Sequence, residues 1–120
     1  MGEKTRILIV DDNSRVRKAL FAYLSTLGWL QVLSEASDGK EALELIESLS
    51  PDIVLMDVQM PTISGLEATR MIKKRWPGIK IIILTLYPDY QFEAQQAGAD
   101  AFLVKGCSME EISSTICSIN

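Results

Sequence analysis

Short runs of consecutive apolar residues recur along the chain, and longer segments with helical apolar spacing separate them. Continuous apolar runs of this length are typical of parallel strands that are covered on both faces. The runs are Ile7–Val10, Ile53–Met56, Ile81–Leu84 and Ala101–Val104, and the first three are rich in β-branched residues. A fifth segment, Gln31–Ala36, mixes polar and apolar residues, which indicates a partly exposed edge strand.

Five segments between and after these runs are predicted to be helices. Apolar residues at steps of three and four predict the first helix over Val16–Leu27, with Gly28 as its end. The same spacing predicts a second helix over Ala42–Leu49, with Pro51 just beyond it. The least regular pattern lies over Asp89–Ala97, whose expected apolar face consists of Phe92, Ala94 and Ala97.

Three pairs of polar residues have the spacing of helix N-terminal caps, in which an Asp or Ser is followed by Glu three residues later. Each pair precedes a segment with helical apolar spacing, and Pro77-Gly78 closes the helix that follows the second pair. The pairs are Asp38 and Glu41, Ser64 and Glu67, and Ser108 and Glu111.

The alternation of strands and helices predicts an α/β fold with a parallel sheet, helices on both faces and right-handed crossovers. The chain has 120 residues, enough for one domain with a single core, and it contains no internal repeat or linker-like segment. We therefore predict one domain over residues 1–120, with no output domain in these residues.

The charge distribution narrows the function classes. The net charge is −4, and the 12 Lys and Arg residues are scattered, which argues against a nucleic-acid-binding surface. No apolar run approaches the ~20 residues of a membrane span, so a cytoplasmic location without membrane association is the default expectation. The chain has no histidine, which excludes a phosphohistidine carrier and removes the commonest metal ligand. Cys107 and Cys117 are interpreted as reduced thiols.

Polar residues follow or end four of the predicted strands. Asp11 and Asp12 come directly after the first strand and Asp57 after Ile53–Met56, while Thr85 and Lys105 follow the last two strands. Ligands of open parallel sheets bind beyond the carboxyl ends of the strands. We therefore expect these five side chains to meet in one crevice.

The expected cluster has a definite chemistry. Three carboxylates within ~5 Å repel by about 3 kcal/mol per pair at an effective dielectric of 20, which favours a bound divalent cation. Because the ligands are all oxygen, Mg²⁺ is favoured, with Mn²⁺ as the alternative. Lys105 and Thr85 offer a positive charge and a hydroxyl donor to a phosphoryl group, and Asp57 can act as the nucleophile.

These residues resemble the receiver domain of bacterial two-component response regulators. The resemblance lies in Asp11-Asp12, Asp57 in LMDVQMP, Gly65, Thr85 and Lys105 in FLVK, and it covers nearly the whole chain. The stretch GLEATRMIKKRWPGIKIIILT is similar to the NarL/LuxR-type subfamily, whose receivers precede a helix-turn-helix DNA-binding domain. The resemblance implies a flavodoxin-like, doubly wound, five-stranded parallel sheet in the order 2-1-3-4-5, with five helices.

The resemblance also implies roles for individual residues. Asp57 would be the phosphoacceptor, and Asp11, Asp12 and the backbone carbonyl of Gln59 would help it hold Mg²⁺. Lys105 would pair with the phosphoryl group. Thr85 would be the switch hydroxyl, and Phe102 the aromatic residue whose rotamer follows it.

The partners that the resemblance implies are a histidine kinase, a second copy of the chain in a phosphorylation-dependent homodimer, and DNA through an output domain. On this reading the chain is a signalling switch that promotes its own aspartyl phosphorylation and dephosphorylation, and not an enzyme acting on other substrates. The kinase, the regulated genes and the phosphate lifetime are left open.

Two positions depart from the family pattern. Gly106 follows Lys105 where many receivers have proline, and a cis bond without proline would cost about 3 kcal/mol, so the geometry of this loop is open. Leu86 follows Thr85 where the family often has a small residue, and its bulk is expected to narrow access to the site. Gln59 and Tyr87 lie where the family varies its hydrolysis rate.

Several alternatives compete with this interpretation. Asp11 and Asp12 could cap the first helix, and Phe102 could serve only in core packing. A phosphohydrolase of the haloacid dehalogenase type also combines Asp, Thr or Ser, Lys and Mg²⁺, but its nucleophile lies in a DxDx(T/V) stretch after the first strand. Here that strand gives adjacent Asp residues followed by Asn13. A pseudo-receiver that has lost phosphorylation is the remaining alternative. The complete set of site residues argues against it, and Leu86 and Gly106 keep it open.

Overall fold

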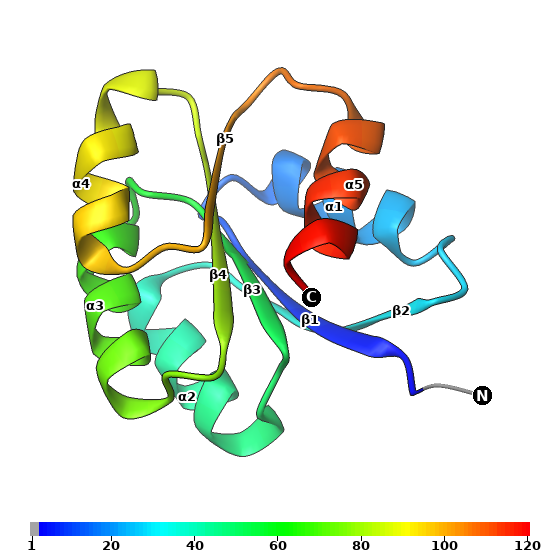
Figure 1. Cartoon of the computed structure of the whole chain (residues 1–120), viewed down its shortest axis with the longest axis horizontal. Coiled ribbons are helices and arrows are strands. Elements are labelled where there is room, and N and C mark those ends of the chain that lie inside the picture. Colours follow the sequence, from blue (N-terminus) through cyan, green and yellow to red (C-terminus); the bar gives the residue numbers. More distant parts are fainter. Residues whose placement is uncertain (1–2) are drawn as a thin grey trace.

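Five strands form one parallel sheet in the computed structural model, which describes residues 3–120 (Figure 1). The order across the sheet is β2-β1-β3-β4-β5, so the predicted flavodoxin-like topology is confirmed. The strands are β1 (Thr5–Val10), β2 (Leu30–Ala36), β3 (Ile53–Met56), β4 (Lys80–Thr85) and β5 (Ala101–Val104). The predicted domain begins at residue 1, and its first two residues lie outside the described part.

Helices cover both faces of the sheet. Two of them, α1 and α5, lie on one face, and α2, α3 and α4 lie on the other (Figure 1). The helices are α1 (Ser14–Leu24), α2 (Gly39–Leu49), α3 (Gly65–Arg75), α4 (Gln91–Ala97) and α5 (Met109–Ile119), and the short 3-10 helix η1 (Pro88–Tyr90) precedes α4. The structure is thus three layers, helix, sheet and helix, as the strand–helix alternation predicted.

Side chains of the central strands alternate between two cores. Ile7 and Ile9 of β1 pack with α1 and α5, while Leu8 and Val10 pack with the helices of the opposite face. All four are buried, and burying one such side chain contributes about 1.5–3 kcal/mol. The continuous apolar runs are therefore explained by a sheet that is covered on both sides and holds the strand ends in fixed positions.

The predicted N-terminal caps are present at three helices. The Asp38 carboxylate accepts a hydrogen bond from the Glu41 N–H at 2.8 Å, which satisfies a free donor of the first turn of α2. The Ser64 and Ser108 hydroxyls accept in the same way at the start of α3 and α5. These local signals were sufficient to fix where three of the helices begin.

The first helix is shorter than predicted, because α1 ends at Leu24 and not at Leu27. After Leu24 the chain tightens into turns, in which the Thr26 and Leu27 N–H groups bond carbonyls three residues earlier. Leu27 still packs against the core formed with α1 and α5. Because Leu27 contacts this core from a turn, its spacing in the sequence looks the same as that of a helical core residue.

The segment predicted as one helix over Asp89–Ala97 is divided into η1 and α4. Its predicted apolar face is only partly correct. Ala94 and Ala97 are buried, but Phe92 is 69% exposed and points away from the core. With only two small residues to bury, α4 forms a helix of just seven residues.

Within residues 3–120, no helix is long and apolar enough to cross a bilayer. The predicted reduced state of the cysteines agrees with the structure, in which Cys107 and Cys117 are both free thiols.

Candidate functional site

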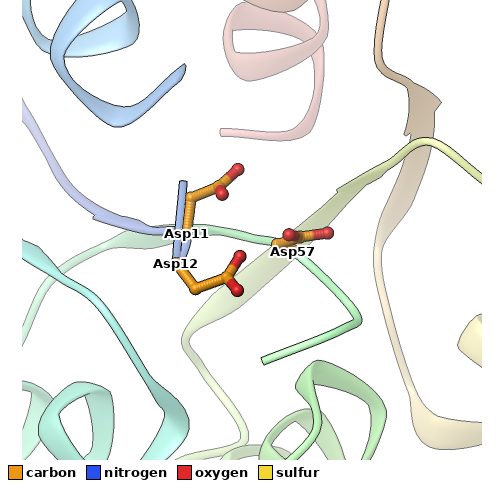
Figure 2. Close-up of side chains that lie close together, drawn as sticks. All are labelled: Asp11, Asp12 and Asp57. Carbon is orange, nitrogen blue, oxygen red and sulfur yellow. The ribbon is translucent and has the colours of Figure 1, made fainter. Parts of the chain in front are cut away.

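The polar residues that follow the strands lie together at one edge of the sheet. Asp11 and Asp12 follow β1, and Asp57 follows its neighbour β3. Figure 2 shows the three side chains extending from these two strand ends. One carboxylate oxygen from each lies within 4.8 Å of the others, which places the three predicted metal ligands in one cluster.

The three carboxylates differ in burial. Asp11 is 2% exposed and Asp57 is 6% exposed, whereas Asp12 is exposed to solvent. The N–H of Asn13 donates to Asp11 Oδ1 at 2.8 Å, and the N–H of Val58 donates to Asp57 Oδ1 at 2.8 Å. Each buried carboxylate therefore has one oxygen engaged by the backbone and a second that faces the cluster.

Lys105 joins the cluster from the loop after β5. Its Nζ lies 2.9 Å from Asp11 Oδ2 and 3.2 Å from Asp57 Oδ2, and the lysine side chain is 12% exposed. One ammonium group thus bridges the two buried carboxylates, in the crevice where the sequence predicts that these residues meet. The pairing of Lys105 with a phosphoryl group stays a prediction. Three carboxylates against one ammonium leave the cluster with an excess of negative charge.

The pKa values of these groups reflect that balance. Burial raises the pKa of Asp57, and the negative charge of Asp11 raises it further, while Lys105 and the Val58 N–H act in the opposite direction. Burial alone would lower the pKa of Lys105, but the hydrogen bond and charge of Asp11, together with those of Asp57, hold it above its usual value. Both directions indicate that an added positive charge would stabilise ionised Asp57.

The donor set fits a hard divalent cation. The ligand atoms that Asp11, Asp12 and Asp57 offer are carboxylate oxygens, which Mg²⁺ and Mn²⁺ prefer over nitrogen or sulfur ligands. The backbone carbonyl of Gln59 stays a prediction as a further ligand. Its side chain has a different contact, donating from Nε2 to Tyr90 Oη at 3.2 Å.

Asp11 and Asp12 do not cap the first helix. The N-terminal cap of α1 is Asn13, whose Oδ1 accepts from the N–H groups of Arg15 and Val16. The alternative that the acidic pair only begins a helix is therefore wrong. Their side chains are left available to the cluster.

The predicted switch residues lie at the ends of β4 and β5. Thr85 is buried, its Oγ1 accepts a hydrogen bond from the Tyr87 N–H at 3.3 Å, and its carbonyl accepts from the Lys105 N–H at 2.7 Å. Phe102 is half-buried and packs at the margin of the core below α4. Leu86 is 60% exposed. The switch roles of Thr85 and Phe102, and the access role of Leu86, stay predictions.

The loop after Lys105 has a defined geometry that the sequence left open. There are no cis peptide bonds within residues 3–120, so the Lys105–Gly106 bond is trans. Gly106 has φ of +106°, a conformation that side chains rarely adopt. This backbone conformation explains why glycine occupies position 106.

Two glycines hold the loop between β3 and α3 close to the site. A Cβ on Gly65 would lie 1.8 Å from the carbonyl oxygen of Asp57, and a Cβ on Gly39 would lie 2.6 Å from that of Ile63. The Gly65 N–H also donates to the Val58 carbonyl at 2.7 Å. Gly65 was part of the predicted motif, but Gly39 was missed, because its close contact is with a loop distant in sequence.

Two charged residues next to the site were also missed. Arg17 of α1 donates from its guanidinium to the carbonyl of Asp11 at 2.6 Å and pairs with Glu35 of β2 at 3.0 Å. Its position six residues after Asp11, on the first helix, is the only sequence signal that could have indicated it. The partner on β2 is not predictable from local spacing.

The response regulator receiver domain family matches residues 7–117 of the chain. Among curated proteins, the chain is 40% identical over 109 residues to the response regulator GacA of Pseudomonas aeruginosa, covering 89% of this chain and 51% of that protein. It is 37% identical over 113 residues to the response regulator protein VraR of Staphylococcus saprophyticus, covering 92% of this chain and 54% of that protein. The chain therefore spans about half the length of the curated relatives it matches.

Solved structures agree with this assignment. The receiver domain of the response regulator NarL from Mycobacterium tuberculosis superposes with a TM-score of 0.93 at 30% identity, covering 98% of this chain and 97% of that one. A LuxR-family DNA-binding response regulator from Staphylococcus aureus gives a TM-score of 0.91 at 32% identity, covering 96% and 98%. The response regulator TrrA of Thermotoga maritima, solved in complex with Mg²⁺ and BeF, gives 0.89 at 35% identity, covering 97% and 99%.

The fold, the cluster at the strand ends and these similarities lead to the same assignment. The family match extends over most of the chain, and the neighbours include NarL and LuxR-family regulators. The chain belongs to the response regulator receiver domain family of two-component systems.

Proposed function

We propose that the chain is a phosphorylation-controlled switch in which Asp57 accepts a phosphoryl group from a histidine kinase. The arrangement of Asp57 carries this proposal: a buried carboxylate at the end of β3, with the Lys105 ammonium 3.2 Å away and the carboxylates of Asp11 and Asp12 beside it. That TrrA was solved with Mg²⁺ and BeF supports a cation site at these residues.

The chemistry requires a nucleophile and a means to stabilise charge. An oxygen of Asp57 attacks phosphorus, while the bond from phosphorus to the histidine nitrogen of the kinase breaks. The electron pair leaves with the imidazole, which takes up a proton from solvent, and an acyl phosphate forms on Asp57. Because Asp57 is the nucleophile as a carboxylate, no general base is needed in a chain that has no histidine.

The other residues position the phosphoryl group and neutralise its negative charge. Asp11, Asp12 and Asp57, with the carbonyl of Gln59, would hold Mg²⁺ or Mn²⁺. When bound, the cation supplies positive charge to the phosphoryl oxygens. Lys105 pairs with Asp57 in this structure. After phosphorylation it would pair with the added phosphoryl group instead.

The switch follows from the new negative charge. Thr85 turns its hydroxyl from the Tyr87 N–H towards the phosphoryl group, and Phe102 fills the space that Thr85 leaves. The surface formed by α4, β5 and α5 repacks in consequence. A shift from mostly inactive to mostly active needs about 5 kcal/mol of differential stabilisation, which several charge-assisted hydrogen bonds can supply.

The output of the switch is proposed to be homodimerisation and control of a DNA-binding output domain in the whole protein. Two observations support an output domain: the relatives are about twice as long as this chain, and one structural neighbour is a DNA-binding regulator of the LuxR family. The chain is proposed to act as a switch that promotes its own phosphorylation and dephosphorylation. Its cytoplasmic location stays a prediction.

The test is intact-mass spectrometry after incubation with MgCl₂ and acetyl phosphate. We expect the mass to rise by one phosphoryl group in the wild type and in Asp89→Asn, an exposed control on η1. No rise is expected in Asp57→Asn or in the presence of EDTA.

Two outcomes would contradict the proposal. A phosphoryl group on Asp57→Asn would place the acceptor elsewhere. No phosphorylation of the folded wild type by either acetyl phosphate or a panel of histidine kinases would favour a pseudo-receiver. In that case Leu86→Ala would show whether access to the site was the obstacle.

A further inference from the structure

Arg17 connects three elements next to the acidic cluster. From α1, its guanidinium donates through Nη1 to the carbonyl of Asp11 at 2.6 Å and pairs through Nε with Glu35 of β2 at 3.0 Å. The side chains of Arg17 and Glu35 are 15% and 24% exposed, so the contacts are largely sheltered from solvent. A planar guanidinium presents its donors in a rigid fork, whereas the three N–H groups of an ammonium rotate on a flexible stem.

The contact is with the backbone of Asp11 and not with its side chain. The N–H of Asp11 donates to the carbonyl of Ala36 at 3.0 Å, and Ala36 is the neighbour of Glu35 on β2. Arg17 takes the other backbone group, the carbonyl. Both polar groups of the Asp11 peptide backbone are thus held, one by β2 directly and the other by an arginine that β2 itself fixes through Glu35.

We infer that Arg17, braced by Glu35, is a positioning residue for the metal-binding acidic pair. It sets the backbone of Asp11 and, through the next peptide bond, that of Asp12, so that both carboxylates face Asp57 before a cation binds. The inference rests on the proposed function, because it assumes that these three carboxylates bind Mg²⁺. Within residues 3–120, Arg17 hydrogen-bonds the backbone carbonyl of Asp11 and the Glu35 carboxylate and none of the three clustered carboxylates, so it acts through the loop.

The charge of Arg17 and its proposed positioning role predict opposite effects on Mg²⁺ affinity, which makes the inference testable. A positive charge beside a cation site weakens cation binding, so neutralising Arg17 should strengthen binding of Mg²⁺ if charge were its only influence. If Arg17 positions the loop, its removal should weaken binding. The sign of the change therefore separates the two readings.

The first experiment measures Mg²⁺ affinity by isothermal titration calorimetry on the wild type, Arg17→Gln, Arg17→Lys and Arg15→Gln. Removing groups that orient metal ligands costs 10–100-fold in affinity, so we expect Arg17→Gln to bind Mg²⁺ about tenfold more weakly. Arg17→Lys keeps the charge but loses the rigid fork in which Nε and Nη1 each hold one partner, and a smaller loss is expected. Arg15→Gln removes the same charge from an exposed position on α1 and should bind like the wild type.

The second experiment needs no metal. The Asn13 N–H donates to Asp11 Oδ1, so its hydrogen-exchange rate, followed by NMR in metal-free protein, reports the loop geometry directly. Exchange should be faster in both Arg17 variants than in the wild type and in Arg15→Gln. A purely global loss of stability would instead accelerate exchange throughout the β-sheet.

The outcomes distinguish this inference from the proposed function. If the wild type binds no Mg²⁺, the proposed metal site fails. If the wild type binds Mg²⁺ and both Arg17 variants bind it equally or more tightly, with Asn13 exchange unchanged, the positioning role is overturned. Should Arg17→Gln fail to fold by circular dichroism, Arg17→Lys alone decides, because at constant charge only a positioning role predicts weaker binding.

Discussion

The two sides of the candidate site are built differently. On the side of β1 and β3, the loops that carry Asp11 and Asp57 are fixed by backbone contacts, by Arg17 and by the close approach of Gly65. On the side of β4 and β5, Leu86 and Phe92 are exposed. The short helix α4 lies along this side (Figure 1), and it has no side-chain cap at its N-terminus.

The two sides match two different requirements of the proposed function. A metal and phosphoryl site requires ligands that are already in place, because ordering them on binding would weaken affinity. A conformational response requires a region whose stability is low enough to change on the addition of a few hydrogen bonds. The first side has ligands in place, and the proposed switch assigns the conformational response to the second side, where α4 buries only Ala94 and Ala97.

The strongest effect is expected from a substitution at Gly65, on the side of β1 and β3, which we call the fixed side. Gly65→Ala places a Cβ 1.8 Å from the Asp57 carbonyl oxygen, so α3 or the Asp57 loop must move. We expect the free energy of unfolding to fall by about 3 kcal/mol or more, as for severe overpacking, and phosphorylation of Asp57 to be lost. Urea denaturation and intact mass measure both.

The control for this change is Gly78→Ala. A Cβ at Gly78 would meet nothing within 4 Å, so its unfolding free energy should stay equal or rise by about 0.4–1 kcal/mol. If Gly65→Ala matched Gly78→Ala in its free energy of unfolding and in phosphorylation of Asp57, the contact between Gly65 and the Asp57 loop would not be as tight as the structure indicates.

A second change, Asp57→Asn, removes one negative charge from the acidic cluster. Burial and Asp11 raise the pKa of Asp57 in the folded state, so the ionised carboxylate destabilises the metal-free protein. Asp57→Asn should therefore raise the free energy of unfolding at pH 7 by about 1–2 kcal/mol, since one carboxylate repulsion amounts to about 3 kcal/mol at 5 Å and Lys105 offsets part of it.

The sign of the pH dependence follows from the same shift. Between the unfolded pKa of 3.8 and the raised folded pKa, the folded state binds more protons than the unfolded state. The contribution of Asp57 to stability therefore falls as pH rises through this window, and the penalty is complete above it. The stability difference between Asp57→Asn and the wild type should grow with pH across that window, and adding MgCl₂ should stabilise the wild type more than the variant. A difference that is constant with pH would contradict this account.

The strand ends were predictable because the sheet geometry follows from local patterns. Continuous apolar runs such as Ile53–Met56 indicate buried parallel strands, and parallel strands bring the residues after them to one edge. Asp11, Asp57 and Lys105 could therefore be placed together from spacing alone. The roles of these residues came from resemblance and from carboxylate chemistry, not from the pattern.

Features that depend on contacts between distant segments were not predictable. Arg17 and Glu35 belong to no motif, and their pairing is fixed only when α1 packs beside β2. Gly39 is constrained by Ile63, which lies on another loop. Phe92 was assigned to a buried face because helical spacing does not reveal that α4 covers only the edge of the sheet.

A third change tests the exposed hydrogen bond between Gln59, in the loop after β3, and Tyr90 of η1. Tyr90→Phe removes the contact between Tyr90 Oη and Gln59 Nε2. We expect the unfolding free energy to fall by only about 0.5 kcal/mol, because the bond is exposed to solvent. Tyr87→Phe is the control, since the Tyr87 hydroxyl makes no hydrogen bond within residues 3–120 and its ring stacks edge-on against Tyr90. Because both variants keep their aromatic rings, equal stability changes would show that the Gln59–Tyr90 hydrogen bond makes no measurable contribution.

The weakest effect is expected on the side of β4 and β5, at Phe92. The side chain is 69% exposed, so Phe92→Ala should change the free energy of unfolding by less than about 0.5 kcal/mol. Ile72→Ala, on the fully buried face of α3, should cost about 2–5 kcal/mol in the same urea experiment. A loss at Phe92 approaching that at Ile72 would mean that α4 is held as firmly as α3, and the contrast between the two sides would no longer hold. A negligible loss would show that Phe92 does not stabilise the fold. Its exposed side chain would then belong to the surface of α4, β5 and α5 that the proposed switch repacks.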